Sequence, residues 1–281
     1  MGASREVIRS AYLRACRQEL DALKPGNVHV FADGHRMSAD HFLDSAEVSS
    51  TPLTNPNLTL GRRILEAVRA TKQAVRMNTN LGIILLCAPL IRAAQMNATE
   101  LRGELDTVLG SMTMDDAAAV FEAIVMASPG GLGSSDAHDV RNAPTVPLLE
   151  AMREASGRDM IARQYVTGYQ DIFEAGLAAH SHSIAQGERG TWPVVFTYMA
   201  FLTAFPDSHV ARKFGREIAA AVQDEAQAVR ASLDATASEQ DRLALLTKFD
   251  RSLKMRGINP GTSADLTVAC LLVHIVRSEL A

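Results

Sequence analysis

Helical periodicity, with almost no strand pattern, is the feature that most constrains how this chain folds. Apolar residues recur three or four positions apart in one segment after another, as at Ile8, Tyr12 and Cys16. Alternating β-branched runs are scarce, aromatic residues make up only 5% of the chain, and Ala, Leu and Met are abundant. The sequence therefore predicts an all-α fold.

The expected helices are separated by polar turns rich in Gly, Pro and Asn. They span residues 4–23, 38–49, 60–77, 83–90, 99–109, 114–127, 147–156, 158–179, 191–205, 214–233 and 239–255, with a last helix that begins near residue 263 and ends at 280. Residues 83–90 are apolar on every face, which predicts a buried helix. We expect a single domain over residues 1–281, a multi-helix bundle whose polar turns gather around one cleft.

Composition excludes several classes of function. With 47% apolar residues the chain can bury a substantial core, and a net charge of -4 gives no basic field for nucleic acid or an anionic membrane. Cys16, Cys87 and Cys270 lie far apart in apolar contexts, which favours reduced core thiols. Because no segment approaches a membrane span of about 18 apolar residues and the first residues lack a signal core, we expect a soluble cytoplasmic protein.

The turn at residues 259–265 opens the last long apolar run. Pro260 and Gly261 make the turn, Thr262 or Ser263 can cap the helix, and Asp265 falls in its first turn. Free N–H groups at such a helix start can bind an anion, beside a carboxylate that could hold a metal or a hydroxyl. This arrangement suits a phosphorylated substrate, although ordinary helix capping gives the same pattern.

Two further turns carry polar side chains that could face the same cleft. In Lys24-Pro25-Gly26-Asn27-Val28-His29, Lys24 supplies a charge for phosphate, and Asn27 and His29 can hydrogen-bond or ligate. The turn at 206–209 adds Asp207 and His209. A plain loop is the alternative for both.

The next candidates are a polar helix start and a glycine-rich loop. Asn78, Thr79 and Asn80 either satisfy one another or face a ligand. The loop at 129–140 includes Gly131, His138 and Asp139, so that a flexible backbone carries groups able to bind a metal or transfer a proton, and the segment Pro129–Asp139 is a candidate lid. His180-Ser181-His182 is interpreted as a helix end with surface histidines.

Several of these motifs, in the same order over nearly the whole chain, resemble the triphosphoribosyl-dephospho-CoA synthase family. They are Lys24-Pro25-Gly26-Asn27-Val28, Asn78-Thr79-Asn80-Leu81-Gly82, Phe249-Asp250-Arg251 and Pro260-Gly261-Thr262-Ser263-Ala264-Asp265-Leu266, with weaker support from the Met37, Phe42, Ser45 spacing and Asp207-Ser208. The resemblance implies an all-helical pentosyl transferase of cofactor biosynthesis. It would move the triphosphoribosyl group of ATP to dephospho-CoA, release adenine, and use Mg²⁺ with the triphosphate.

The motifs and the resemblance together give the candidate residues. Lys24 would contact phosphate, Asn78 and Gly82 would shape the nucleotide pocket, and Arg256, Ser263 and Asp265 would line the same site. The catalytic candidates are Asp265, Asp207 and His29, and the metal candidates are Asp139 and Asp265. The candidate substrate-binding residues are Lys24, Asn27, Asn78, Asn80, Gly82, Gly131, Arg163, His209, Arg256 and Ser263.

The chain departs from the family pattern at four places. It has Asn80 and Leu81 where family members commonly have His-Lys, His29 where an acidic residue is usual, and Arg163-Gln164-Tyr165 in place of a segment with Gly and Glu. The loop from Pro129 to Gly133 has no obvious counterpart in the family. Two alternatives therefore stay open. One is a divergent member that acts on another phosphorylated cofactor, such as a pterin- or furan-based one-carbon carrier, because that branch of the family resembles this chain in its Asn-Thr-Asn-Leu-Gly motif. The other is a non-catalytic nucleotide-binding or scaffold protein. The acceptor and a homodimeric state are left undecided.

Overall fold

The structure is a computed structural model that describes residues 3–130 and 138–280. Within these ranges the chain is helical, and the only β-type pairings are isolated bridges in the segment between the first two helices. The all-α prediction is confirmed. The helices are α1 (Arg5–Asp21), α2 (Ala39–Leu53), α3 (Leu60–Val75), α4 (Leu81–Asn97), α5 (Leu101–Gly110), α6 (Met114–Ala127), α7 (Leu148–Ala155), α8 (Met160–Thr167), a π-helix η1 (Asp171–Gly176), α9 (Leu177–Ala185), α10 (Trp192–Ala204), α11 (Ser208–Phe214), α12 (Arg216–Asp234), α13 (Glu239–Met255) and α14 (Gly261–Glu279).

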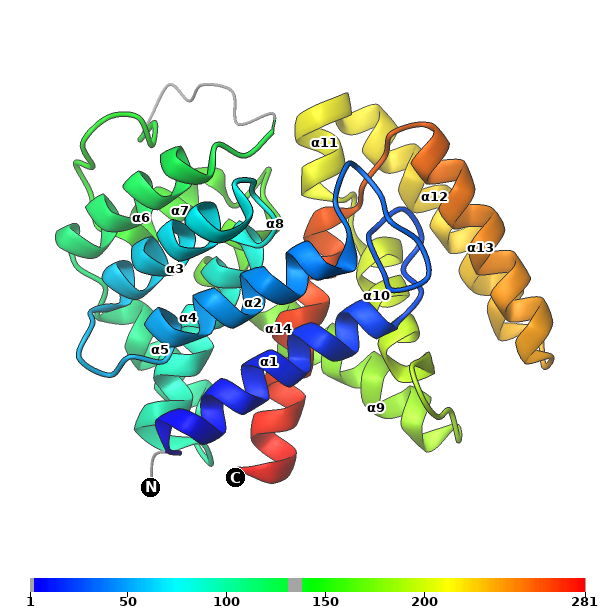
Figure 1. The fold of residues 1–281 in the computed structure, drawn as a ribbon, viewed down its shortest axis with the longest axis horizontal. Helices are drawn as coiled ribbons and strands as arrows, with labels where there is room; N and C mark the ends of the chain where they lie inside the picture. Colours follow the sequence, from blue (N-terminus) through cyan, green and yellow to red (C-terminus); the bar gives the residue numbers. More distant parts are fainter. Residues whose placement is uncertain (1–2, 131–137, 281) are drawn as a thin grey trace.

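Helix α14 lies at the centre of the molecule. It packs against α1, α4, α8, α10, α11 and η1. Figure 1 shows α3, α6, α7 and α8 on one side of α14 and α9 to α13 on the other. One apolar core runs from Ile8 to Val276 through both sides. This continuity supports the single-domain prediction, which otherwise stays a prediction.

Helix α4 is the second central element. Its residues from Leu81 to Ile91 are all buried, which confirms the buried helix expected from an apolar run with no polar face. Within the described ranges no single helix has both the length and the apolar content to cross a membrane; α4 and α5 have them only as a pair, bent by 118°.

A proline in α4 leaves one carbonyl group free to accept from a buried tyrosine, and a second buried tyrosine bonds to the next carbonyl group. Pro89 has no N–H to donate to the carbonyl group of Leu85, one helical turn earlier. The hydroxyl of Tyr165 donates to that Leu85 oxygen at 2.7 Å, and the hydroxyl of Tyr169 donates to the Leu86 oxygen at 3.0 Å. These contacts hold α8 and the segment after it against α4.

The structure corrects three expectations. Residues 158–179 do not form one helix, because Gly168 and Tyr169 both have left-handed backbone angles, with φ of 59°, that end α8 before η1 begins. Residues 214–233 are likewise not one uninterrupted helix, since Gly215, with φ of 95°, separates α11 from α12. His180 is not a surface residue: it is buried inside α9, where its Nδ1 lies 3.1 Å from the hydroxyl of Thr197.

Candidate functional site

A cavity of about 810 Å³ lies where the polar turns meet. Its walls come from the segment after α1, the turn before α4, the helices α6, α7, α8 and α11, and the start of α14. The described residues thus bring together three turns that are far apart in the sequence, as the sequence predicts. Its volume is within the usual range of pockets for a small organic ligand.

Asp265 packs directly against Gly82 at this cavity. Both residues line it, Asp265 from the first turn of α14 and Gly82 from the first turn of α4. A Cβ atom placed on Gly82 would lie 2.0 Å from Oδ2 of Asp265 and 2.9 Å from Cδ1 of Ile161. Only glycine therefore leaves room for the carboxyl group in this position.

The surroundings of Asp265 favour its protonated form. Removal from water raises the pKa of Asp265 well above its usual range, and the negative charges of Asp207 and Glu19 raise it further, against the opposing effect of Arg212. A carboxyl group with a raised pKa on a cavity wall is suited to proton transfer. Asp265 is therefore the strongest catalytic candidate in the cavity.

Asp207 joins the starts of two helices. Its Oδ1 accepts from the backbone N–H groups of His209 and Val210 at 2.9 and 3.1 Å. Its Oδ2 accepts from both the backbone N–H and the hydroxyl of Ser263, each at 2.8 Å. The sequence predicts that the start of α14 can bind an anion. In this structure the carboxylate of Asp207 lies there and accepts these hydrogen bonds. Catalytic or substrate-binding roles for Asp207 and Ser263 stay predictions.

The cationic side chains of the described cavity wall were not identified from the sequence; they are Arg36, Arg158, Arg212, Lys213 and Arg216. Arg158 pairs with Glu154 at 3.5 Å and Arg212 with Asp159 at 2.6 Å. The other three are exposed, and no ion pair joins any of them to an acidic side chain in the described ranges. They could bind a polyanion. Lys213 and Arg216 flank the break at Gly215, and helical periodicity alone does not show that break.

Arg36 lies in a strained turn. The backbones of Gly34 and Met37 bond to each other in both directions, at 3.1 and 2.8 Å, and the two residues between them, His35 and Arg36, have φ of 55° and 65°. Such turns usually carry Asn-Gly, and each larger side chain in this conformation costs on the order of 1 kcal/mol. The Nε2 of His35 donates to the carbonyl oxygen of Gly26 at 2.8 Å, which fixes the turn. The strain is located at the cavity, where both side chains line the wall.

Lys24 lies behind the cavity wall. Its buried ammonium donates to the carbonyl oxygens of Glu19 and Val28 at 2.7 and 2.9 Å and lies 3.2 Å from the Glu19 carboxylate. Burial lowers the pKa of Lys24 and raises that of Glu19, and each charge opposes the shift of the other. Glu19 lines the cavity and Lys24 does not. These contacts favour a structural role, and the predicted phosphate contact of Lys24 stays a prediction.

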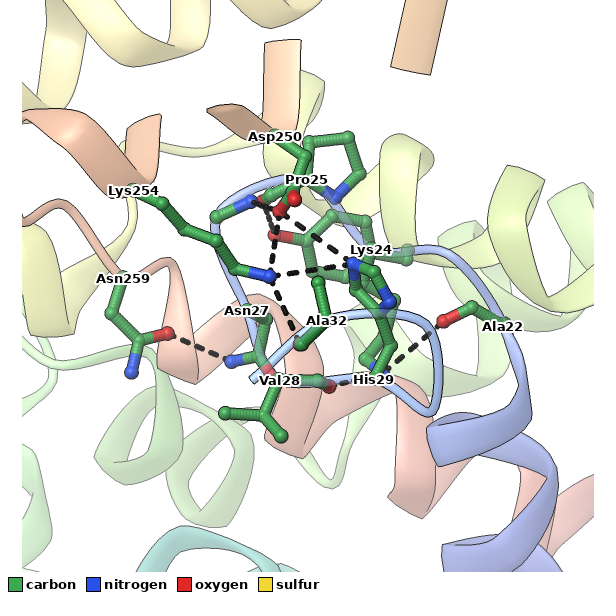
Figure 2. Close-up of polar contacts among 12 residues, drawn as sticks. Ala22, Lys24, Pro25, Asn27, Val28, His29, Ala32, Asp250, Lys254 and Asn259 are labelled. Atoms are coloured by element: carbon green, nitrogen blue, oxygen red, sulfur yellow. Dashed lines mark hydrogen bonds and ion pairs between the residues drawn. The ribbon is translucent and has the colours of Figure 1, made fainter. Parts of the chain in front are cut away.

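His29 belongs to a network that holds the same turn onto α13 (Figure 2). The Oδ1 of Asp250 accepts from the backbone N–H of Gly26 at 2.8 Å, lies 3.1 Å from the Lys254 ammonium, and lies 3.6 Å from Nε2 of His29. Burial lowers the pKa of His29, and its contact with Asp250 opposes this shift. His29 is outside the lining of the cavity, and its catalytic role stays a prediction.

Four further candidate residues line the cavity. The Nδ2 of Asn27 donates to Oδ1 of Asn259 at 2.8 Å, a contact drawn in Figure 2. Asn78 accepts from the N–H of Leu81 at 3.2 Å. His209 is packed against Gly261, and burial lowers its pKa. The fourth, Asp139, lies 2.6 Å from the guanidinium group of Arg141.

Three other candidates lie outside this lining. Asn80 is buried and donates to the carbonyl oxygen of Ser45 at 3.3 Å, so it stabilises the start of α4 from inside. Arg163 pairs with Asp171 at 2.8 Å, and Arg256 pairs with Glu225 at 2.6 Å. Their roles in substrate binding stay predictions. Gly131 and most of the glycine-rich loop are outside the described residues, and so is the lid prediction.

The described residues contain no preformed metal cage. No group of three His, Cys, Asp or Glu side chains within them is arranged to hold a metal ion. Mg²⁺ often takes only one or two carboxylates and completes its shell with water and substrate phosphate. Asp265 meets that smaller requirement, since it presents one carboxyl group to the cavity.

Comparison with known proteins gives three matches. Residues 5–281 match the CitG family model, ATP:dephospho-CoA triphosphoribosyl transferase. A curated relative, the 2-(5''-triphosphoribosyl)-3'-dephosphocoenzyme-A synthase of Pectobacterium atrosepticum, is 31% identical over 113 residues, which is 40% of this chain and 35% of the relative. The match thus spans about a third of that relative's length. A crystal structure from Archaeoglobus fulgidus, of a proposed triphosphoribosyl-dephospho-CoA synthase, has the same fold, with a TM-score of 0.64, 23% identity, and coverage of 84% of this chain and 99% of that one.

Proposed function

Because the chain belongs to the family of ATP:dephospho-CoA triphosphoribosyl transferases, we propose that it moves the triphosphoribosyl group of ATP to a ribose hydroxyl of dephospho-CoA and releases adenine. The observation that carries the proposal is the Asp265 carboxyl group, held against Gly82 on the wall of a cavity large enough for a nucleotide. The comparisons favour neither a pterin- or furan-based carrier nor a non-catalytic role over this reaction.

The reaction breaks a C–N and an O–H bond and forms a C–O and an N–H bond. The acceptor hydroxyl oxygen attacks the anomeric carbon of the ATP ribose while the bond from that carbon to the adenine nitrogen breaks. Asp265, in its ionised form, would take the hydroxyl proton and then give it to the departing adenine nitrogen, so that charge and atoms balance. A carboxylate whose pKa is raised by burial and by the nearby charges of Asp207 and Glu19 is a stronger base than an exposed aspartate.

The cations suggest where the triphosphate lies. Arg36 and Lys213 approach the cavity from two segments distant in sequence, and Arg216 extends the group along α12. Their charges are available for phosphate oxygens because none of them is used in an ion pair within the described ranges. The apolar walls contributed by α6, α7 and α8 would then face the adenine and the two ribose rings.

Magnesium would enter with the triphosphate. Asp139 and Asp265 are the two candidate ligands on the cavity wall, and Asp139 would add the protein oxygen while Asp265 acts as the base. When bound, the ion would neutralise part of the charge on the phosphates. Asp265 would not hold the metal and act as the base in the same step.

A direct assay tests the proposal. The purified protein is incubated with ATP, Mg²⁺ and dephospho-CoA, and adenine and the condensed product are measured by chromatography and mass spectrometry. We expect adenine and product in equal amounts, and neither when dephospho-CoA is omitted. Absence of adenine with both substrates present would refute the proposed transfer.

A further inference from the structure

A second pocket, of about 280 Å³, lies beside the main cavity. It is formed by the C-terminal ends of α3 and α6, by the residues that follow each of them, and by the segment that leads into α4. Met77, Asn78 and Leu81 line both the second pocket and the main cavity. The two spaces are therefore separated by no more than these side chains.

The charged side chains around the second pocket are all cationic. Lys72 and Arg76 line it, and its lining includes no Asp or Glu among the described residues. The ammonium of Lys72 donates to the carbonyl oxygen of Met126 at 3.0 Å, near the end of α6. Arg76 is exposed and has no ion pair with any described acidic side chain, so its charge is available to a ligand.

The backbone at Arg76 is in an unfavourable conformation for its side chain. Arg76 is the C-cap of α3 and has φ of 58° and ψ of 17°, in the left-handed region where glycine is usual. Nearby, the buried hydroxyl of Thr71 on the same wall has no hydrogen-bond partner. An arginine where glycine would fit better, in the same pocket wall as an unsatisfied hydroxyl, favours a binding site over a site shaped for stability alone.

The two proposed substrates together need more room than the main cavity provides. The main cavity, at about 810 Å³, falls within the range of about 300–1,000 Å³ that holds a single small ligand. ATP and dephospho-CoA must both enter so that the acceptor ribose meets the donor ribose beside Asp265. The acceptor carries a diphosphate directly next to that ribose, followed by a long amide-containing pantetheine arm.

The geometry points to the second pocket as the binding site for the diphosphate and pantetheine arm of the acceptor, with Arg76 contacting phosphate. This inference rests on the proposed function. Val68, Met77 and Met126 provide apolar contacts for the hydrocarbon parts of the arm, and Asn78 provides a polar side chain at the passage between the two spaces. Arg36, Lys213 and Arg216 would thus bind the triphosphate of ATP, and Arg76 would bind the diphosphate of the acceptor.

The test is calorimetric titration of Arg76→Gly against the wild type. Glycine removes the guanidinium and relieves the left-handed backbone, so the thermal midpoint should stay the same or rise. We expect affinity for both dephospho-CoA and 4'-phosphopantetheine to fall about tenfold, a loss consistent with one charge-assisted contact, while affinity for ATP is unchanged. The matched control is Arg62→Ala, which removes another exposed arginine of α3 that pairs with Glu66 outside both pockets.

Unchanged binding of 4'-phosphopantetheine and dephospho-CoA to Arg76→Gly would overturn the inference, and so would an equal loss in Arg62→Ala. A second variant, Thr71→Val, fills the same volume without the unpaired hydroxyl; its folding should be intact, and weaker binding of 4'-phosphopantetheine to it would place the arm against this wall. The adenine assay distinguishes failure of the proposed function from failure of this inference. If the wild type releases no adenine but binds 4'-phosphopantetheine through Arg76, the proposed transfer is wrong and the binding pocket is confirmed.

Discussion

The Asp265 carboxylate occupies the space that a side chain at Gly82 would need. The two residues come from the first turns of α14 and α4, both largely buried in the core. The position of the carboxyl group is therefore set by the packing of two central helices and not by a surface loop. Sites carried on rigid elements hold their geometry more accurately than sites carried on loops.

Replacing Gly82 with alanine should disable the site. The added methyl group would collide with Asp265 at 2.0 Å and with Ile161 at 2.9 Å, so we expect loss of about 1–3 kcal/mol of stability by overpacking and a fall of at least about tenfold in kcat/KM. Gly103→Ala in α5 is the matched control, since no atom lies within 4 Å of its new Cβ. That variant should be stabilised by about 0.5–1 kcal/mol with unchanged activity, measured by urea unfolding and adenine release.

The pH dependence of the reaction should report on Asp265. Because burial and the charges of Asp207 and Glu19 raise its pKa, the base form is lost on the acid side at a higher pH than for an ordinary aspartate. We expect kcat/KM to fall as pH decreases, with a midpoint above the usual value of about 3.9. Asp265→Asn should reduce kcat about 10²–10⁴-fold and remove that limb. A variant that keeps both rate and limb would exclude Asp265 as the base.

Asp207 should matter mainly for stability. Asp207→Ala removes an acceptor shared by four donors at the starts of α11 and α14, of which, within the described ranges, only the His209 N–H keeps a second acceptor, the Thr262 hydroxyl at 3.1 Å. We expect the free energy of unfolding to fall by about 2–4 kcal/mol. Asp207→Asn keeps one acceptor oxygen and should lose less. Urea unfolding of both variants measures the difference, and equal losses would contradict this account.

Lys24 variants separate a structural role from phosphate binding. Lys24→Met leaves the Glu19 carboxylate buried without its partner, and we expect a loss of about 3–5 kcal/mol in stability. The double variant Glu19→Gln, Lys24→Met removes both charges and should recover most of this loss. If ATP affinity in the folded double variant matches the wild type, Lys24 does not contact phosphate; a clear loss would support the prediction from the family motif.

Arg36 and Arg256 provide a direct comparison. The structure puts Arg36 on the cavity wall and pairs Arg256 with Glu225 outside it, whereas the family motif predicts Arg256 in the site. We expect Arg36→Ala to raise the KM for ATP about tenfold and to weaken its dependence on salt. Arg256→Ala should leave the KM unchanged. The opposite pattern would favour the motif over the geometry.

Much of the architecture is predictable from the sequence because helix-forming residues and polar turns alternate along the chain. The candidate Asp265 is predictable for the same reason, since its turn precedes a long apolar run. The contacts of Lys24 are not predictable in this way: in the structure its ammonium lies 3.2 Å from the Glu19 carboxylate, while the phosphate contact expected from the Lys-Pro-Gly turn stays a prediction. That position of the ammonium depends on tertiary packing, which spacing does not reveal.

Three cationic residues that the sequence does not identify, Arg36, Lys213 and Arg216, all lie beside an irregular backbone conformation that helical periodicity does not reveal. Arg36 lies in the strained turn between Gly34 and Met37, and Lys213 and Arg216 lie on either side of the helix break at Gly215. The break at Tyr169 was missed for the same reason, because a tyrosine with φ of 59° is held by its contact with α4. Cytoplasmic location, oligomeric state and the metal candidates stay predictions.

The double role of Asp207 has a consequence for which donors the protein accepts. By capping both α11 and α14, it fixes the separation between Lys213 at one end of α11 and Asp265 on α14. A fixed separation between a proposed phosphate contact and the proposed base favours one length of phosphate chain. We therefore expect ADP and AMP to be poorer donors than ATP although they carry the same base and sugar, and adenine release from each nucleotide measures the difference.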